Sequence, residues 1–321
     1  MKRLFSLLLA TIVCSPLPLR ADSALPHGVR INGNEFIRIP AGEFTFTSEA
    51  DPGHLADPNH TPFRHVRIWL DDYYIAKYEA RAGDQLRFMQ SGSVSPEALE
   101  RLAAAQSEQA GFAANGDPGC TVRRRADGTY YLAWPDSNMP ATELSWELAE
   151  QFARWLGFRL PSEAEWEKAA RGGQGQRLWP WGDEYPDDTV AHFTWSRNCH
   201  PLPVDSLDKG RSYYGAYNMA GNVAEHVSDW YNHQADQALR PGQKNPPLAA
   251  TGTPSPYRTP DKITKGGKWS QSPAHLTISS RRRIDPHTAT PGEGVRFAID
   301  AARVRELLAQ GLATAIEEAR Q

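Results

Sequence analysis

The spacing of apolar residues along the chain predicts few helices. The clearest one has a single apolar face, made by Ala149, Phe152, Ala153 and Leu156. Ser145 can cap the start of this helix and Gly157 can end it. A second helix should follow, because Ser162 and Glu165 have the spacing of a capping box, in which each side chain bonds the backbone of the other residue.

Strand patterns are short and are separated by turn residues. They cover residues 35–39, 65–70, 73–77, 130–133 and 295–299. Two further helices are expected, a short one over residues 96–105 and an amphipathic C-terminal helix over residues 301–321. The apolar stripe of the latter consists of Val304, Leu307, Leu308, Leu312, Ala315 and Ile316. We expect this stripe to pack on its own domain, with packing on a partner protein as the alternative.

Long stretches between these elements, such as residues 171–214 and 232–260, contain turn residues and aromatics but no sustained period. Loops of this length need ions, a disulfide or packed tryptophans to hold them in a compact domain. The chain has ten tryptophans, and glycine and proline are spread along it instead of marking one linker. The pattern therefore predicts a single loop-rich domain, which we place at residues 35–300.

The N-terminus has the pattern of a secretory signal peptide. A basic start precedes an apolar run over residues 4–13, which is too short to span a bilayer. We predict cleavage after Ala21, so that residues 1–21 are removed and the mature protein is periplasmic and has no membrane span. Lipid attachment at Cys14 is less favoured, because the preceding Val13 is bulky. The formal charge of -3 is close to balance and gives no sign of a nucleic-acid partner.

Two cysteines, Cys120 and Cys199, remain after this cleavage. In an oxidising compartment, an even number of cysteines favours a disulfide between them. Two buried free thiols are the alternative, because the sequence does not fix the distance between their Cα atoms.

Several blocks of the chain follow one another in an order that is typical of one enzyme family. They are residues 39–42, 74–79, 140–146, 159–167, 169–173, 181–182, 217–223, 265–267 and 294–297. With these blocks the chain resembles the formylglycine-generating-enzyme family, also called sulfatase-modifying factors, over about residues 35–299. The resemblance implies a C-type-lectin-like α+β fold, rich in loops, with twisted antiparallel sheets and few helices. The paired Gly266 and Gly267 also indicate positive φ or a close backbone approach beside the family's cleft.

In this family, a stretch of the pattern Asn-x-x-Gly-Asn-x-x-Glu binds calcium. The resemblance implies that the ligands here are Asn218, Glu225 and the backbone carbonyls of Gly221 and Val223. Calcium takes six to eight oxygen ligands and can therefore hold loops together. Capping of loops by Asn218 and Glu225 without an ion is the alternative. The chain departs from the family's Trp-Glu-Trp at this place, since Ala224 and His226 flank Glu225, and a second calcium site near residues 191–193 is expected to be degraded or absent.

Formylglycine-generating enzymes hold copper with two cysteines that follow the paired glycines, and soft sulfur ligands suit Cu(I). Residues 268–277 of this chain contain no cysteine. The resemblance therefore implies a member that lacks the catalytic cysteine pair, and we expect no copper-thiolate centre.

Polar residues of the same region are candidates for a substrate cleft. The substrate-binding candidates are Trp269, Gln271, His275 and Arg281. Candidates for catalysis are His275, Arg281 and Glu293, because an imidazole can move protons near neutral pH and a guanidinium can clamp a carboxylate. Structural roles are the alternative: a core position for Trp269, a hydrogen-bonded surface position for His275, and a loop that is salt-bridged to Asp285 for the arginines.

The export signal and the missing cysteines together favour a tailoring role. Exported members of the family without the cysteine pair include the periplasmic maturation protein of pyoverdine siderophore clusters. We therefore hypothesise a periplasmic maturation factor, an oxidoreductase if it is an enzyme, that acts on a peptide-derived metabolite such as a pyoverdine-type siderophore precursor. A non-catalytic lectin-like module that binds a protein or glycan, or assists an exported redox enzyme, is the main alternative. A formylglycine oxidase with relocated thiols at Cys120 and Cys199 is the third.

Overall fold

The structure is a computed structural model that describes residues 25–48, 64–109, 121–173, 177–194, 200–232, 238–246 and 260–316. The predicted signal peptide and the predicted disulfide of Cys120 and Cys199 lie outside the described residues. Within the described ranges, no helix has the length and apolar content that crossing a bilayer requires.

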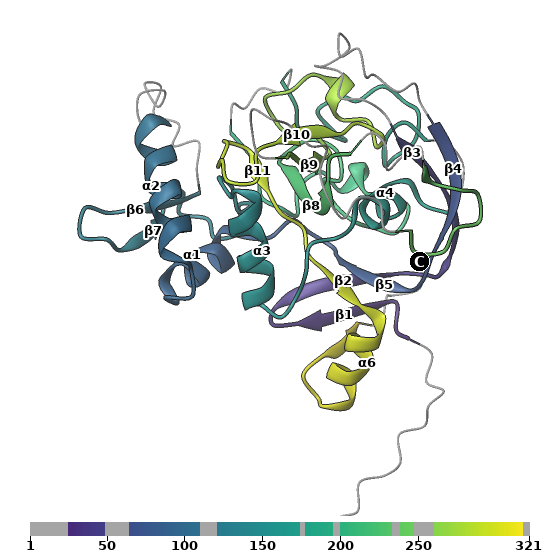
Figure 1. Ribbon diagram of the computed structural model, residues 1–321, viewed down its shortest axis with the longest axis horizontal. Coiled ribbons are helices and arrows are strands. Elements are labelled where there is room, and N and C mark those ends of the chain that lie inside the picture. Colours follow the sequence, from purple (N-terminus) through teal and green to yellow (C-terminus); the bar gives the residue numbers. More distant parts are fainter. Residues whose placement is uncertain are drawn as a thin grey trace, which may run out of the picture.

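Two β-sheets organise the domain (Figure 1). The larger sheet has the strand order β12-β5-β2-β1-β13, and all its neighbouring strands are antiparallel. Its strands are β1 (Gly28–Ile31), β2 (Asn34–Ile39), β5 (Tyr73–Ala76), β12 (Ala298–Asp300) and β13 (Thr314–Ile316). This sheet therefore joins the first and the last described segments of the chain.

The second sheet has the order β10-β9-β8-β11. Its strands are β8 (Ala224–Trp230), β9 (Lys262–Lys265), β10 (Arg282–Ile284) and β11 (Glu293–Gly294). Strand β9 is antiparallel to both β8 and β10, whereas β8 and β11 are parallel. Helix α4 (Glu163–Arg171) packs against β8 and β9, and Figure 1 shows it beside them. One face of this sheet is therefore covered by α4.

The remaining elements border the two sheets. The strands β3 (Gly42–Ser48) and β4 (Arg64–Leu70) pair with each other, as do β6 (Val122–Arg124) and β7 (Tyr130–Leu132). The other helices of the described residues are α1 (Ala82–Gln90), α2 (Pro96–Gln109), α3 (Trp146–Trp155) and α6 (Ala301–Ala309). Short 3-10 turns span Asp208–Gly210 and Pro273–His275. Figure 1 shows α1, α2, β6 and β7 as a group at the left edge of the domain.

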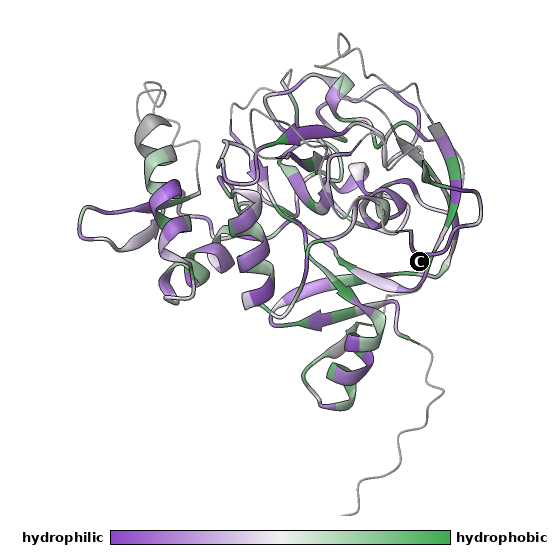
Figure 2. Ribbon diagram, in the orientation of Figure 1, coloured by the Kyte–Doolittle hydropathy of each residue, from purple (hydrophilic) through white to green (hydrophobic). Residues whose placement is uncertain are grey.

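Apolar side chains form two large core clusters. One contains Phe88, Phe152 and Phe297, and it joins helices α1 and α3 to the five-stranded sheet. The other contains Trp166 and Ile263, and it packs α4 against the second sheet. Figure 2 shows the visible side of α3 as largely hydrophilic, in agreement with an apolar face that is turned toward the core. The mixed α+β, loop-rich fold that the sequence predicts is confirmed.

Both capped helices are confirmed. The Ser145 side chain accepts a hydrogen bond from the backbone nitrogen of Leu148 at the start of α3. At the start of α4, Ser162 and Glu165 make both bonds of the predicted capping box. Local side-chain chemistry therefore sets where these two helices begin.

The prediction of one C-terminal helix over residues 301–321 is wrong. Helix α6 ends at Ala309, and residues 314–316 form β13, which pairs with β1. Gly311, with φ 68°, takes a conformation that ends the helix, and the edge of β1 offers backbone partners to the next segment. Val304 and Leu307 are buried in the same core as α3, so this part of the apolar stripe packs on its own domain as expected.

Residues 295–299 do not form one strand, in contrast to the prediction. The chain leaves the second sheet after β11 and enters the five-stranded sheet at β12. Arg296 lies between them and is fully buried, and its guanidinium bonds Glu225. The segment therefore connects the two sheets. The interior ion pair holds it, together with backbone hydrogen bonds from Ala80 to Val295 and from Ala76 to Phe297.

Candidate functional site

The candidate site lies on the face of the second sheet that is opposite α4. Successive strand residues point to opposite faces of a sheet. Glu225 bonds Trp166 of α4, so its neighbours Ala224 and His226 point away from that helix. Thr264 of β9 lies opposite both His226 and Arg282 of β10. His226, Thr264 and Arg282 therefore form a row across three strands.

Thr264 and Arg282 of this row, but not His226, line a cavity of about 10 Å³ at the paired glycines, which we call the small cavity. It is lined by Ala224, Thr264, Gly266, Gly267, Gln271, His275, Ser280 and Arg282. Gly266 and Gly267 have φ of 85° and 68°, and a Cβ atom on Gly267 would lie 2.8 Å from the carbonyl oxygen of His275. Both the positive φ and the close backbone approach that the sequence indicates are therefore confirmed.

The structure divides the predicted substrate-binding set. Gln271 and His275 both line the small cavity, where Gln271 accepts from the backbone of Lys268 at 3.1 Å and His275 Nδ1 lies 3.1 Å from the Ser272 hydroxyl. Trp269 is buried and packs so closely on Gly292 that a Cβ atom there would lie 2.7 Å from its ring. Only two of the four side chains therefore share a cavity.

Arg281, the fourth member, points elsewhere. Its Nε donates to Glu163 of α4 at 2.9 Å, and its Nη2 pairs with the second oxygen of the same carboxylate. The pair is buried on the α4 side of the sheet. The alternative of salt bridges between the arginines at residues 281–283 and Asp285 is wrong, because these arginines pair with carboxylates that are farther away in the sequence. Arg281 pairs with Glu163, Arg282 with Glu293, and Arg283 with Asp261.

Glu293 lies next to the small cavity through its partner. Its carboxylate is fully buried, and Oε1 accepts from Arg282, which lines the cavity. Burial raises the pKa of Glu293, while the nearby Arg282 and Lys268 act in the opposite direction. Burial also disfavours the charged form of Lys268 and thereby lowers its pKa to about 8. The surroundings of Glu293 therefore favour its neutral form more than water does.

His226 is the imidazole that lies deepest in this region. The side chain is 0% exposed, and its Nε2 lies 2.7 Å from the carbonyl oxygen of Leu144. Burial lowers the pKa of His226 to about 4, and the carbonyl only partly offsets this. The ring is therefore neutral at physiological pH. Since a carbonyl can only accept, Nε2 carries the hydrogen and Nδ1 is an acceptor.

The side chains that were predicted to bind calcium have protein partners. Arg296 donates to both oxygens of Glu225 at 2.6 to 3.1 Å, and the Trp166 indole donates at 2.6 Å. Asn218 donates through Nδ2 to Glu79 at 2.9 Å. The described residues contain no group of three or more His, Cys, Asp and Glu side chains that could hold a metal ion. Glu225 thus has a guanidinium as its cationic partner, and calcium at this place stays a prediction.

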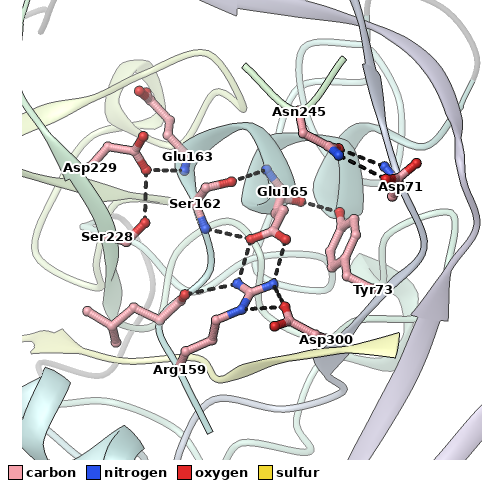
Figure 3. Close-up of polar contacts among 11 residues, drawn as sticks. Asp71, Tyr73, Arg159, Ser162, Glu163, Glu165, Ser228, Asp229, Asn245 and Asp300 are labelled. Atoms are coloured by element: carbon pink, nitrogen blue, oxygen red, sulfur yellow. Dashed lines mark hydrogen bonds and ion pairs between the residues drawn. The ribbon is translucent and has the colours of Figure 1, made fainter. Parts of the chain in front are cut away.

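A larger cavity of about 790 Å³ lies at the start of α4, and Figure 3 shows the polar contacts of several residues that line it. Arg159 joins two of its carboxylates, with contacts of 2.7 Å to Glu165 and 2.7 to 2.8 Å to Asp300. Asp71, Asp72 and Glu150 also pair with cations of the chain. Each carboxylate that lines this cavity is paired with an arginine or lysine of the chain. These charged groups therefore already stabilise the fold without a ligand.

The sequence of the chain is similar to those of known proteins. Residues 23–301 match the family of the sulfatase-modifying factor enzyme 1-like domain. The chain belongs to this family. The formylglycine-generating enzyme of Bos taurus is 27% identical over 315 residues, which cover 87% of this chain and 78% of that enzyme. Hercynine oxygenase of Mycobacterium tuberculosis is 34% identical over 165 residues, which cover 50% of this chain and 37% of that protein.

Among solved structures, PvdO from Pseudomonas aeruginosa is similar in fold to this chain. The TM-score is 0.58 at 20% sequence identity, and the match covers 87% of this chain and 100% of PvdO. This likeness concerns the fold, and it agrees with the two-sheet, loop-rich architecture described above.

Sequence reasoning missed three residues of the site. His226 had one signal, because it stands where the family usually has a tryptophan. Arg282 had a weak signal as part of the run of three arginines at residues 281–283, and Thr264 had none, since it lies in no family motif that carries chemistry. The pairing of β9 with both β8 and β10 places them beside His226. Only the sheet register therefore reveals this part of the site.

Proposed function

We propose that this family member is a periplasmic maturation factor that tailors a peptide-derived metabolite, such as the precursor of a pyoverdine-type siderophore. The observation that carries the proposal is the chemistry of the small cavity. Among the residues that the structure describes, its lining offers amide, imidazole, hydroxyl and guanidinium groups and no thiol. Such a set can bind and orient a polar ligand, whereas a thiolate pair is suited to hold Cu(I).

Two further features support this proposal. The sequence begins with the pattern of a signal peptide, which is the export route that a periplasmic factor requires. The fold is similar to that of PvdO, and a part of the chain is similar to an enzyme named hercynine oxygenase. If the protein turns over a substrate, we place it among oxidoreductases without a copper-thiolate centre.

Incubation of the purified mature protein with the immature siderophore tests the proposal. We expect the chromophore absorbance to change with time. His275→Ala should lower the rate by a factor of about 10² or more while binding is retained, because His275 lines the small cavity. His287→Ala is the matched control, since His287 is exposed and contacts Glu147 instead. An unchanged absorbance, together with normal siderophore in a deletion strain, would refute the idea.

A binding or accessory module is the second candidate. It is favoured by the structural partners of two of the catalytic candidates, since Arg281 pairs with Glu163 and Glu293 pairs with Arg282. Calorimetric binding of the siderophore precursor without any turnover would support this candidate. A formylglycine oxidase with relocated thiols is the third, and it requires that Cys120→Ser or Cys199→Ser abolish oxidation of a sulfatase peptide. We expect no such oxidation by the wild-type protein.

A further inference from the structure

Three buried ionisable side chains lie between helix α4 and strand β9. Glu163 and Glu167 are one helical turn apart on α4, so both point to the same side of the helix. Lys265 is the last residue of β9 and lies opposite Glu225, whose side chain bonds Trp166 of α4. The side chains of the lysine and the two glutamates on α4 are at most 1% exposed. The sheet register therefore directs the lysine toward these two carboxylates.

The two oxygens of Glu167 have different surroundings. Oε1 accepts hydrogen bonds from the backbone nitrogen of Thr47 at 2.7 Å and from Arg171 at 2.9 Å. Oε2 is buried and has no hydrogen-bond partner among the described residues. Nζ of Lys265 lies 3.9 Å from this second oxygen. The carboxyl group is therefore held through Oε1, while Oε2 faces no donor that is closer than the lysine amine.

Burial favours the uncharged forms of both groups. It raises the pKa of Glu167, although the nearby Arg171 and Lys265 act in the opposite direction. It lowers the pKa of Lys265, against the effect of the two carboxylates. An uncharged amine is a nucleophile, and a protonated carboxyl group can lose one oxygen as water. Both groups are therefore shifted toward the forms in which an amine and a carboxylic acid condense.

We propose that Lys265 and Glu167 form an amide bond with each other, which cross-links β9 to α4. The bond between Nζ and the carboxyl carbon Cδ forms, and the bond between Cδ and Oε2 breaks. One water molecule leaves, and no oxidant, reductant or cofactor takes part. Oε1 remains as the amide oxygen. The product replaces a buried amine and a buried carboxyl group by one neutral amide, which removes the cost of burying their charges.

The neighbours of this pair supply the groups that the condensation needs. Attack by Nζ of Lys265 places negative charge on Oε1 of Glu167, where the Thr47 nitrogen and the Arg171 guanidinium already donate. Glu163 is the proton acceptor, because its Oε1 lies 3.4 Å from Nζ. Burial alone would raise the pKa of Glu163, but the nearby guanidinium and amine lower it, so this carboxylate is ionised. The proton that it takes from Nζ passes to Oε2, which leaves as water.

The position of the pair in the fold also favours the bond. Helix α4 packs against β9, and the side chains of Lys265 and Glu167 are both 0% exposed. Two groups that the fold holds together react as if they were highly concentrated, and exclusion of water disfavours hydrolysis of the product. Lys265 directly precedes Gly266 and Gly267, which line the small cavity. The cross-link therefore fixes the end of the strand that leads into this cavity.

Mass spectrometry of the purified, reduced wild-type protein tests the proposal. We expect its mass to be lower than the mass calculated from its sequence by one water molecule. Trypsin cleaves after lysine and arginine, but not after a lysine whose amine is bonded. A digest should therefore contain a branched peptide in which residues 160–168 are joined to residues 263–268. Lys168 is an internal control, because its buried amine bonds the carbonyl oxygen of Pro40 and no carboxylate, so trypsin should cleave after it.

Lys265→Arg is the matched variant, because arginine keeps a positive charge but cannot form this amide. We expect its mass to equal the calculated mass and its digest to contain residues 160–168 as a linear peptide. Loss of one water molecule in this variant as well would place the loss elsewhere and overturn the proposal. A wild-type protein of full calculated mass, whose digest contains residues 160–168 and 263–265 as separate peptides, would also overturn it. The wild-type result depends neither on the folding of the variant nor on the proposed function, since no substrate is used.

Discussion

Arg296 and Glu225 form a buried ion pair in which the guanidinium donates to both carboxylate oxygens, at 2.6 to 3.1 Å. Arg296 also donates to the carbonyl oxygens of Ala76 and Tyr217, so this pair connects β8 with β5 and with the loop before β8. Both side chains are almost completely excluded from solvent. The pair therefore holds the segment between β11 and β12, which connects the two sheets, in place.

Neutralising one partner should destabilise the fold strongly. In Glu225→Gln, Arg296 loses the carboxylate that it bonds, and breaking a buried pair in this way costs about 3 to 5 kcal/mol. Urea unfolding at pH 7 measures the change in the free energy of unfolding. Glu150→Gln is the control, because Glu150 and Arg154 form an exposed pair on α3 that should contribute under about 1 kcal/mol. Equal changes in the two variants would contradict the role of the buried pair.

The calcium prediction calls for a separate measurement. If the ion binds at Asn218, Glu225 and the carbonyls of Gly221 and Val223, it stabilises only the folded state, so the unfolding temperature should rise with calcium concentration. We expect calcium, but not magnesium, to raise the unfolding temperature of protein that has been treated with a chelator. Asn218→Ala should reduce this response. An unfolding temperature that is independent of both chelator and calcium would leave Glu225 with Arg296 as its only cation.

The sequence predicted those parts of the fold that depend on local chemistry. The two helix starts at Ser145 and Ser162 are examples, because each cap acts within three residues. The pairing of the strands could not be predicted from the sequence, since the partners of β8 come from segments tens of residues away. The residues of the candidate functional site could not be predicted for the same reason. Arg281 was expected in a cleft, yet its carboxylate partner Glu163 lies 118 positions earlier in the chain and no local pattern marks it.

Cys120 and Cys199, the two cysteines that the predicted cleavage would leave, give a prediction about redox state. If Cys120 and Cys199 are bridged, thiol titration of the unfolded, unreduced protein should detect no free thiol. Reduction, or Cys120→Ser, should lower the free energy of unfolding by about 2 to 5 kcal/mol. Cys199→Ser should give the same loss, and the double variant should add nothing to it. Two titratable thiols, or losses that add up, would show that the cysteines are independent.

Asp229 should make the stability depend on pH between about 4 and 7. Its carboxylate is buried and accepts from the backbone nitrogen of Glu163 at 2.7 Å and from the Ser228 hydroxyl (Figure 3). Burial, and then the charge of Glu163, raise the pKa of Asp229 to about 6 from an ordinary value of 3.8. The folded state therefore holds this proton more tightly than the unfolded state. The resulting stabilisation is complete below about pH 3.8 and is lost as the pH rises through about 6.

Asp229→Asn removes this proton equilibrium and keeps an acceptor for the Glu163 nitrogen. A shift of about two pKa units corresponds to about 3 kcal/mol, so the variant should gain roughly that much relative to the wild type between pH 4 and pH 7. Urea unfolding of both proteins at several pH values measures the difference. Asp71→Asn is the control, because Asp71 is half exposed and its pKa is lowered by hydrogen bonds to Asn245 and Lys244. A constant difference between wild type and Asp229→Asn across this range would mean that Asp229 is already ionised in the folded protein at acidic pH, with the start of α4 stabilising its charge.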